Sequence, residues 1–156
     1  MKYMLSLFFI YFIFIILLEL KLVTMGMFHY YNLKVSEVFI FDDFLINQIK
    51  EGAIIKSHHN DELKTLIHKH FNDRNIAYIS NRVMSYSVDP MTYKETEQIP
   101  NLVAMAIIPK TKAMRNSAKY ERQFYKKPYQ IFDNLSAAII WVHNIIALKN
   151  NVVENI

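Results

Sequence analysis

The sequence contains no cysteine and only two glycines, Gly26 and Gly52. The absence of cysteine excludes disulfide bonds, thiol nucleophiles and thiolate metal sites. A phosphate-binding loop, a dinucleotide-binding fingerprint and the nucleophile elbow of a serine hydrolase each need two or more glycines close together, because the backbone must approach a phosphate or turn sharply. Two widely separated glycines cannot supply any of these motifs. The usual nucleotide-dependent and serine-hydrolase chemistries are therefore disfavoured.

What the sequence does contain is enough apolar surface for a core. Of its 156 residues, 53% are hydrophobic, which suffices for one domain with at most one appendage. The formal net charge of +4 and the isoelectric point near 9.2 are mildly basic. Such a charge permits contact with anionic partners but does not require it.

The longest apolar run lies at the N-terminus, from Tyr3 to Leu18. As a helix it would be roughly 24 Å long, which is shorter than the roughly 30 Å hydrocarbon core of a bilayer. An extension to Val23 reaches a spanning length but includes Glu19 and Lys21, whose charges would have to reach one membrane interface.

Three interpretations of this run remain open. It could be a signal peptide, although no typical small-residue cleavage site follows it. It could be a membrane anchor, in which case we expect a cytoplasmic domain tethered to the membrane. It could also precede a true start at Met25 or Met27. We therefore divide the chain into a hydrophobic segment (1–26), a folded domain (27–148) and a polar tail (149–156) that is expected to fray.

The first part of the domain predicts a β-hairpin followed by a helix. Apolar and aromatic residues predict strands over 28–33, 38–41 and 44–49, with a turn at Asp42-Asp43. Asn60 is expected to cap a helix, because apolar positions recur after it with helical spacing. These positions are Leu63, Leu66, Ile67, His70 and Phe71.

The second part alternates strands and helices. Strands are predicted over 76–80, 102–108 and 129–132, and helices over 90–98, over 111–125 and at the C-terminus. Asp89-Pro90 is a helix-start signal, and Asp133 or Asn134 can cap the last helix. That helix is expected to turn inward Leu135, Ala138, Ile139, Val142 and Ile146. The order predicts an α/β domain whose mixed sheet has an N-terminal antiparallel hairpin and then parallel βαβ units, with about four helices.

The segment 76–90 is the best candidate for a functional site. A buried strand leads through a polar loop to a helix N-terminus, and α/β folds bind ligands at such carboxyl ends of strands. A guanidinium, free backbone N–H groups and a helix dipole together favour a phosphate or carboxylate there. The competing interpretation is that the polar groups satisfy the loop backbone and cap the helix, with the arginine in a structural role. The candidate ligand- or partner-binding residues are Asn81, Arg82, Ser85, Tyr86, Ser87 and Asp89.

Several segments spread over roughly residues 28–146 carry a family resemblance. They are Phe39-Ile-Phe-Asp-Asp-Phe44 with Asn47 to Gly52, Tyr78-Ile-Ser-Asn-Arg82, Ser85-Tyr-Ser-Val-Asp-Pro90, Asn101-Leu-Val-Ala104 and Phe132-Asp-Asn-Leu135. They resemble the STAS domain, the SpoIIAA-like fold of anti-sigma-factor antagonists and of the cytoplasmic tails of sulfate transporters. The resemblance is closer to small bacterial proteins described as STAS-like or CRAL-TRIO-like. It implies a non-enzymatic regulatory or binding module.

The same resemblance identifies two candidate phosphoacceptors. Antagonist-type STAS domains carry a phosphorylatable serine in an Asp-Ser-Ser-Gly-like segment at the start of the helix after the third strand. This chain has no such segment, but Ser85 and Ser87 lie in the equivalent loop. The resemblance therefore implies that these two serines are the candidate sites of a phosphorylation switch.

No residue pattern predicts a catalytic site or a metal site, and no cofactor is expected. His68 and His70 are two residues apart on the predicted helix, so they point to different faces. The pairs Asp42-Asp43 and Asp61-Glu62 have structural explanations, in a turn and at a helix N-terminus. Neither pair has the setting of acid–base machinery.

Five cations recur at helical spacing in the predicted helix 111–125 and just after it. Steps of three and four residues place them on one face, with Ala113, Tyr120 and Phe124 opposite. This face is either the solvated side of a core-packed helix or a patch for anionic lipid or an acidic protein. Nucleic acid is disfavoured, because no aromatic residues interleave with the cations. The five residues are Lys112, Arg115, Lys119, Arg122 and Lys126.

The sequence thus favours a STAS-like regulatory or binding module that docks a protein partner, or a small anionic or lipid ligand, through the loop 81–89. The alternative is a membrane-anchored protein whose basic helix 111–126 contacts anionic lipid or an acidic partner. An enzyme ranks third, because neither a nucleophile–base pair nor a metal-ligand constellation can be recognised.

Overall fold

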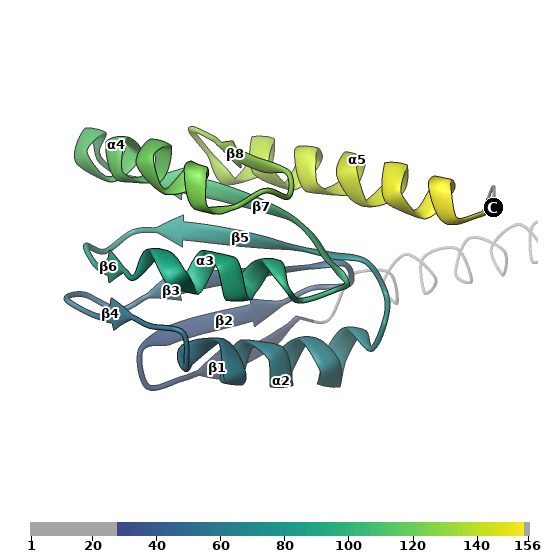
Figure 1. The fold of residues 1–156 in the computed structure, drawn as a ribbon, viewed down its shortest axis with the longest axis horizontal. Coiled ribbons are helices and arrows are strands. Elements are labelled where there is room, and N and C mark those ends of the chain that lie inside the picture. Colours follow the sequence, from purple (N-terminus) through teal and green to yellow (C-terminus); the bar gives the residue numbers. More distant parts are fainter. Residues whose placement is uncertain (1–27, 155–156) are drawn as a thin grey trace, which may run out of the picture.

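A six-stranded mixed sheet organises residues 28–154, the part of the chain that the computed structural model describes (Figure 1). Its strands lie in the order β1 (His29–Asn32), β2 (Ser36–Ile40), β3 (Phe44–Ile49), β5 (Ile76–Arg82), β7 (Leu102–Pro109) and β8 (Tyr129–Ile131). The first three strands pair antiparallel, and β3, β5, β7 and β8 pair parallel. The predicted mixed sheet is confirmed. The predicted hydrophobic segment 1–26 lies outside the described residues.

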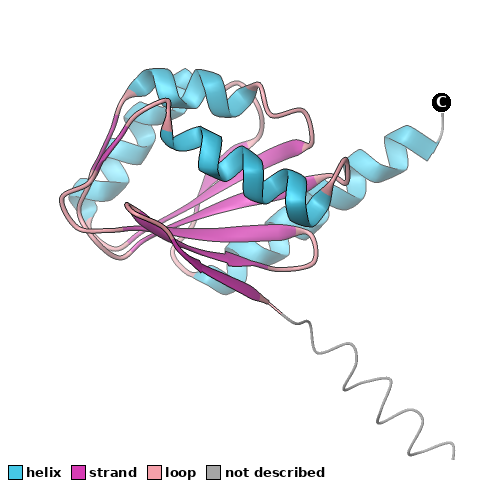
Figure 2. Ribbon diagram, turned by 90° about the horizontal axis from the view of Figure 1, so that it is seen from below, coloured by secondary structure: helices cyan, strands magenta, loops and turns pink. Residues whose placement is uncertain are grey.

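Four α-helices cover the sheet within residues 28–154, as predicted: α2 (His59–Phe71), α3 (Pro90–Glu97), α4 (Lys112–Glu121) and α5 (Leu135–Glu154). A 3₁₀ turn, η1 (Arg122–Phe124), extends α4. α2, α3 and α4 pack on one side of the sheet, which we call the three-helix face, and α5 packs on the other, the α5 face (Figure 2). No described helix is both long and apolar enough to cross a bilayer.

The sheet separates two core layers. On the α5 face, Ala138, Val142 and Ile146 of α5 pack against β3, β5 and β7. The apolar stripe of α2 packs against the three-helix face through Leu63, Leu66, Ile67 and Phe71. Strand β7 is buried along all 8 of its residues, as expected for a central strand covered on both sides.

Strand β5 presents two unlike faces, because successive side chains of a strand alternate. Ala77 and Ile79 point to the α5 face and are completely buried. Tyr78, Ser80 and Arg82 alternate with them and point to the three-helix face. A central strand between two covered faces is ordinarily apolar on both sides, so these three polar side chains must find partners inside the protein.

A second, two-stranded parallel sheet pairs β4 (Ile54–Ile55) with β6 (Ser87–Val88). The Ser87 N–H donates to the carbonyl of Ala53 (3.0 Å), and the Asp89 N–H donates to the carbonyl of Ile55 (2.8 Å). We expected residues 87–88 to be loop. Strands of two residues carry no periodicity, so the sequence offers no pattern that predicts β6.

The start of α2 differs from the prediction. Asn60 does not cap the helix but lies inside its first turn, where it is 4% exposed. Its side chain donates to the carbonyl of Thr92 (3.2 Å) and accepts from the hydroxyl of Thr96 (3.1 Å). The amide therefore links α2 to α3. It forms hydrogen bonds with buried groups of α3 instead of capping its own helix.

The other helix ends follow their signals more closely. Asp89 caps α3 by accepting from the Met91 N–H (3.0 Å), and Asn134 caps α5 by accepting from the Ala137 N–H (2.9 Å). α5 continues to Glu154, beyond the expected start of a frayed tail at residue 149. Its first residue, Leu135, was expected to face inward and is 36% exposed instead.

The orientation of α4 also differs from the prediction. Ala113 and Tyr120 were expected to lie opposite the cations, towards the core, but both are exposed, and the buried residue is Ala118. The Tyr120 ring packs edge-on against Phe124 at the surface, with ring centroids 5.5 Å apart. The small Ala118 side chain lets the helix approach β7 and turns Glu121 towards the interior.

Candidate functional site

The predicted loop lies at the carboxyl end of β5, but it is shorter than expected. Asn81 and Arg82 complete β5, so the connection to β6 is residues 83–86. Asn81 is half-buried and Arg82 is buried. The loop thus presents a smaller set of side chains to solvent than the sequence suggested.

The loop is fastened to the turn that precedes β4. The Gly52 N–H donates to the carbonyl of Ser85 (2.8 Å), and the Ser85 N–H donates to Glu51 Oε2 (2.9 Å). Gly52 adopts φ 69°, a conformation that favours glycine over any side-chain-bearing residue. One of the two glycines of the sequence is therefore used to place the loop.

Three predicted site residues remain exposed at this edge: Ser85, Ser87 and Asp89. Asp89 is engaged in capping α3, which is the structural role that the sequence allowed for it. The side chains of Ser85 and Ser87 face solvent, on a loop and a strand that are held by backbone hydrogen bonds.

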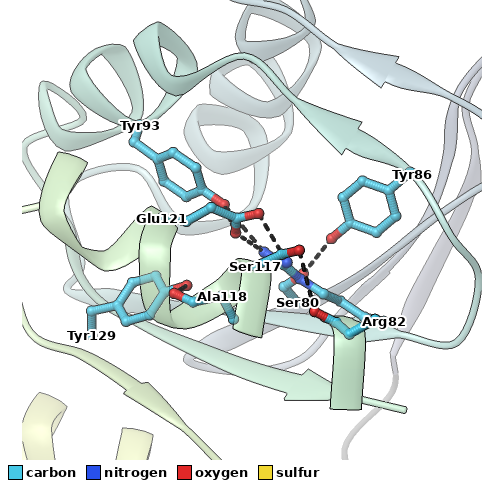
Figure 3. A network of polar contacts seen from close by, with 9 residues as sticks. Ser80, Arg82, Tyr86, Tyr93, Ser117, Ala118, Glu121 and Tyr129 are labelled. Atoms are coloured by element: carbon cyan, nitrogen blue, oxygen red, sulfur yellow. Dashed lines mark hydrogen bonds and ion pairs between the residues drawn. The ribbon is translucent and has the colours of Figure 1, made fainter. Parts of the chain in front are cut away.

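Arg82 lies beneath the loop rather than on it, with 5% of its surface exposed. Nη1 donates to Glu121 Oε1 (3.2 Å) and Nη2 to Glu121 Oε2 (2.5 Å), as Figure 3 shows. Nη2 also donates to the hydroxyl of Tyr93 (3.1 Å), which donates to Glu121 Oε2 (2.5 Å). The guanidinium is therefore neutralised inside the protein. These contacts are those of a structural arginine.

Tyrosines complete this network on both sides. The ring of Tyr86 lies 5.3 Å from Arg82 Cζ, and its hydroxyl shares a hydrogen bond with Ser80 Oγ (3.0 Å). Burial raises the pKa of Tyr86 and raises that of Tyr93 well above its ordinary value, against the opposing charge of Arg82. Both phenols therefore stay protonated at neutral pH and serve as hydrogen-bonding groups.

Sequence reasoning missed Glu121, Tyr93 and Ser80 as members of this network. A usable signal was present in β5, where polar residues occupy alternate positions 78, 80 and 82 of a strand predicted to be buried. Such alternation indicates a polar lining on one face. Glu121 gave no signal of its own, because it lies among the cations of the predicted basic helix.

A cavity of about 70 Å³ lies beside the network, between the sheet and helices α2 and α3. Apolar walls come from the hairpin, α2 and β7, including Val38, Ile49, Leu63 and Ile107. A cavity needs roughly 10–15 Å³ of this volume to hold one water molecule, so this one admits several water molecules or one small organic molecule.

Two polar atoms of the cavity lining have no hydrogen-bond partner among the described protein atoms: Asn47 Oδ1 and Arg82 Nε. Asn47 is 8% and Arg82 5% exposed. The sheet register pairs Asn47 with Ser80, which is two residues before Arg82 on the same face. The two side chains therefore start from backbone positions roughly 7–8 Å apart. One acceptor and one donor thus line the same small cavity.

The cavity offers no free positive charge to a ligand. Among the described residues, Arg82 is the only lysine or arginine in its lining, and Glu121 already neutralises it. Glu62 and His59 of α2 are the other titratable residues of the lining apart from tyrosines. A buried ligand with a net charge would lack a counter-charge here, which is costly.

The predicted basic stripe lies elsewhere, over the β7–β8 side of the sheet. Arg115 is engaged with the Asp133 carboxylate and also donates to the carbonyl of Phe132 (3.3 Å). The other four cations are exposed, namely Lys112, Lys119, Arg122 and Lys126. β1 and β8 are opposite edges of the six-stranded sheet, so this stripe is roughly 24 Å from the edge where the described chain begins.

The histidines have ordinary contacts in the described part of the chain. His70 Nε2 and the Tyr31 hydroxyl share a hydrogen bond (2.6 Å), and His143 lies 3.4 Å from the Asp43 carboxylate. Within residues 28–154, no three His, Asp or Glu side chains are grouped as metal ligands.

Comparisons with known proteins give similarity in structure but not in sequence. No family model matches the chain, and no curated protein matches it either. The structure is similar to that of an uncharacterised protein of the DUF3478 family with a SpoIIAA-like fold, from Shewanella loihica PV-4. The TM-score is 0.45 and the sequence identity 8%, over 75% of this chain and 93% of that chain. That protein has the type of fold expected from the sequence resemblance.

Proposed function

We propose that this chain is a non-enzymatic regulatory module that docks a protein partner through the edge formed by residues 52–55 and 83–91, here called the β6 edge. The observation that carries the proposal is a group of large apolar side chains exposed on this edge. Ile54 is 59%, Met84 47% and Met91 51% exposed. They lie on segments joined by the β4–β6 ladder and by the hydrogen bonds of Ser85.

Removing these side chains from water is the favourable contribution that a partner would gain. Burial of apolar surface contributes roughly 25 cal/mol per Å². Methionine suits such a surface, because its flexible and polarisable side chain adapts to different partners. The backbone beneath is already fixed by hydrogen bonds, so little ordering entropy would be lost on docking.

Under this proposal, phosphorylation of Ser85 or Ser87 switches docking off. Both are exposed beside the three apolar side chains. A phosphate on either hydroxyl would add about −1.5 to −2 charge to a surface that docks through apolar contacts. Phosphorylation would therefore oppose docking.

Site-specific photo-crosslinking in the native cell tests the proposal. A photoreactive residue at Met84 or Met91 should give one discrete crosslinked partner, whereas the same residue at Leu148, which is 62% exposed on α5, should not. Ser85→Glu with Ser87→Glu should abolish the crosslink, and the matched Ser→Ala pair should retain it. Equal crosslinking from Met84 and Leu148 would refute docking at the β6 edge.

A second candidate function rests on the four exposed cations of α4 and the segment after it. They could hold the domain against an anionic membrane surface or an acidic partner, at about 1 kcal/mol for each cation near such a membrane. The test is sedimentation of the full chain with anionic and with neutral vesicles. Lys119→Gln with Arg122→Gln should weaken binding to the anionic vesicles but not to the neutral ones. Added salt should also weaken binding to the anionic vesicles. Equal binding to anionic and neutral vesicles would refute this second candidate function.

A further inference from the structure

We propose that the cavity between the sheet and helices α2 and α3 is a binding site for a small uncharged molecule that carries both a hydrogen-bond donor and an acceptor, such as a short-chain carboxamide. Asn47 Oδ1 would accept from the ligand, and Arg82 Nε–H would donate to it. This inference goes beyond the proposed docking function and does not depend on it.

The first reason is the unmet hydrogen-bonding capacity of the lining. Asn47 and Arg82 are both more than nine-tenths buried, and each has one polar atom without a partner within residues 28–154. Buried polar groups in folded proteins are almost always paired, and an unpaired one is a clear cost. Both atoms belong to residues of one small cavity, on neighbouring strands of one sheet face. A single ligand can therefore satisfy both.

The second reason is that the rest of the network holds these two residues in place. The terminal nitrogens of Arg82 are fixed by Glu121, and Tyr86 covers its guanidinium. Nε is the one guanidinium nitrogen without any hydrogen-bond partner among the described residues. Ser80, which pairs with Asn47 across the sheet, is bonded to Tyr86. The donor and the acceptor are thus preorganised, which lowers the cost of binding.

The third reason concerns charge and size. Glu121 compensates Arg82, so a carboxylate or phosphate in the cavity would lack a counter-charge. The apolar walls and the volume of about 70 Å³ favour a short aliphatic body over a sugar, nucleotide or lipid. A small amide meets all of these conditions, because it is neutral, donates through its nitrogen and accepts through its oxygen.

Methyl NMR titration of the full chain with three probes of nearly equal size tests the site. Propionamide has a donor and an acceptor, 2-butanone has only the acceptor, and propionate is the charged counterpart. Propionamide should shift the methyl signals of Val38, Ile55 and Ile107 saturably, with a Kd on the order of 1 mM. The other two probes should bind at least about fivefold more weakly.

Two variants and a control separate binding from folding. Asn47→Leu removes the acceptor with little change in size, so it should weaken propionamide binding about fivefold. It also removes the side-chain hydrogen bond between Asn47 and Tyr78, so the melting temperature should fall modestly while the domain stays folded. Val88→Phe fills the cavity from β6 and should abolish binding of all three probes. Leu148→Ala, on the far face, should change neither result.

Three results would overturn the site. They are the absence of saturable shifts with propionamide, equal binding of the three probes, and unchanged propionamide binding in Asn47→Leu. Should Asn47→Leu fail to fold, the probe comparison on the unaltered chain and the Val88→Phe variant still decide the matter.

Discussion

On the α5 face, strand β5 contributes Ala77 and Ile79 to an apolar layer, whereas on the three-helix face it contributes Tyr78, Ser80 and Arg82 to a polar one. The α5 face is stabilised by the close packing of buried apolar side chains. The three-helix face holds an ion pair, tyrosines and a cavity. Strand β5 thus contributes to the apolar core on one side and to a polar network on the other.

The tyrosines show the same division. Burial raises the pKa of five tyrosines that all lie in or beside the core of the three-helix face, namely Tyr78, Tyr86, Tyr93, Tyr125 and Tyr129. The buried cluster on the α5 face contains no tyrosine among the described residues. Alkaline pH should therefore act on one face of the sheet.

The largest expected effect is alkaline unfolding through this face. In the folded protein these five phenols ionise above their ordinary pKa, while in the unfolded chain they ionise near pH 10. Stability contributed by the neutral phenols is therefore present below pH 10 and lost as the pH rises above it. Circular dichroism and tyrosinate absorbance should change together. Gradual ionisation of all tyrosines before any loss of structure would show that the folded domain does not protect these buried phenols from ionisation.

Arg82→Ala is expected to be the most damaging single substitution in the polar network. It leaves Glu121, which is 13% exposed, without its cation, at a cost of about 3 kcal/mol in the free energy of unfolding. Replacing both partners by apolar residues, Arg82→Met with Glu121→Leu, should recover most of this loss. Denaturant unfolding of the unaltered chain and of these two variants makes the comparison. A double variant no more stable than the single one would show that the ion pair is not the cause.

Ile79→Ala tests the apolar side of the same strand. The side chain is fully buried against the α5 layer, so its truncation should cost about 2–3 kcal/mol through lost burial and a new cavity. The effect should not depend on pH, since that buried cluster contains no titratable group among the described residues. A loss of unfolding free energy that varies strongly between about pH 6 and 9 would show that the two faces of the sheet are energetically coupled.

Ser80→Ala should have the smallest effect of the set. It removes one hydrogen bond to Tyr86 and costs about 1 kcal/mol. Because that bond helps to place Tyr86 over Arg82, the methyl signals of Val88 should shift even though stability changes little. Unchanged Val88 signals would show that Tyr86 is held by packing alone.

The fold could be predicted from the sequence because its main signals are local. The hairpin with its turn at Asp42-Asp43, the stripe of α2 and the caps Asp89 and Asn134 each follow from a few neighbouring residues. The predicted sheet follows from the order of these elements. What the sequence could not show was the partner of each polar residue.

The site was predicted only in part for that reason. Arg82 was identified by its position before a helix, but Glu121 lies 39 residues further along the chain and only the fold brings them together. The same holds for Asn60, whose partners are on α3 rather than at its own helix end. The rotation of α4 depended on a small residue, Ala118, meeting β7. Contacts between distant residues leave no local pattern.

Strand β7 has a consequence for the newly made chain. All of its residues are buried in the finished domain, yet residues 102–108 leave the ribosome before α5 exists to cover them. This uncharged, β-prone stretch is the composition that self-associates when exposed. Pro100 stands just before it, and Pro109 with Lys110 follows it, at positions where gatekeeper residues limit such association. A substitution that delays the docking of α5 would therefore first be noticed as inclusion bodies.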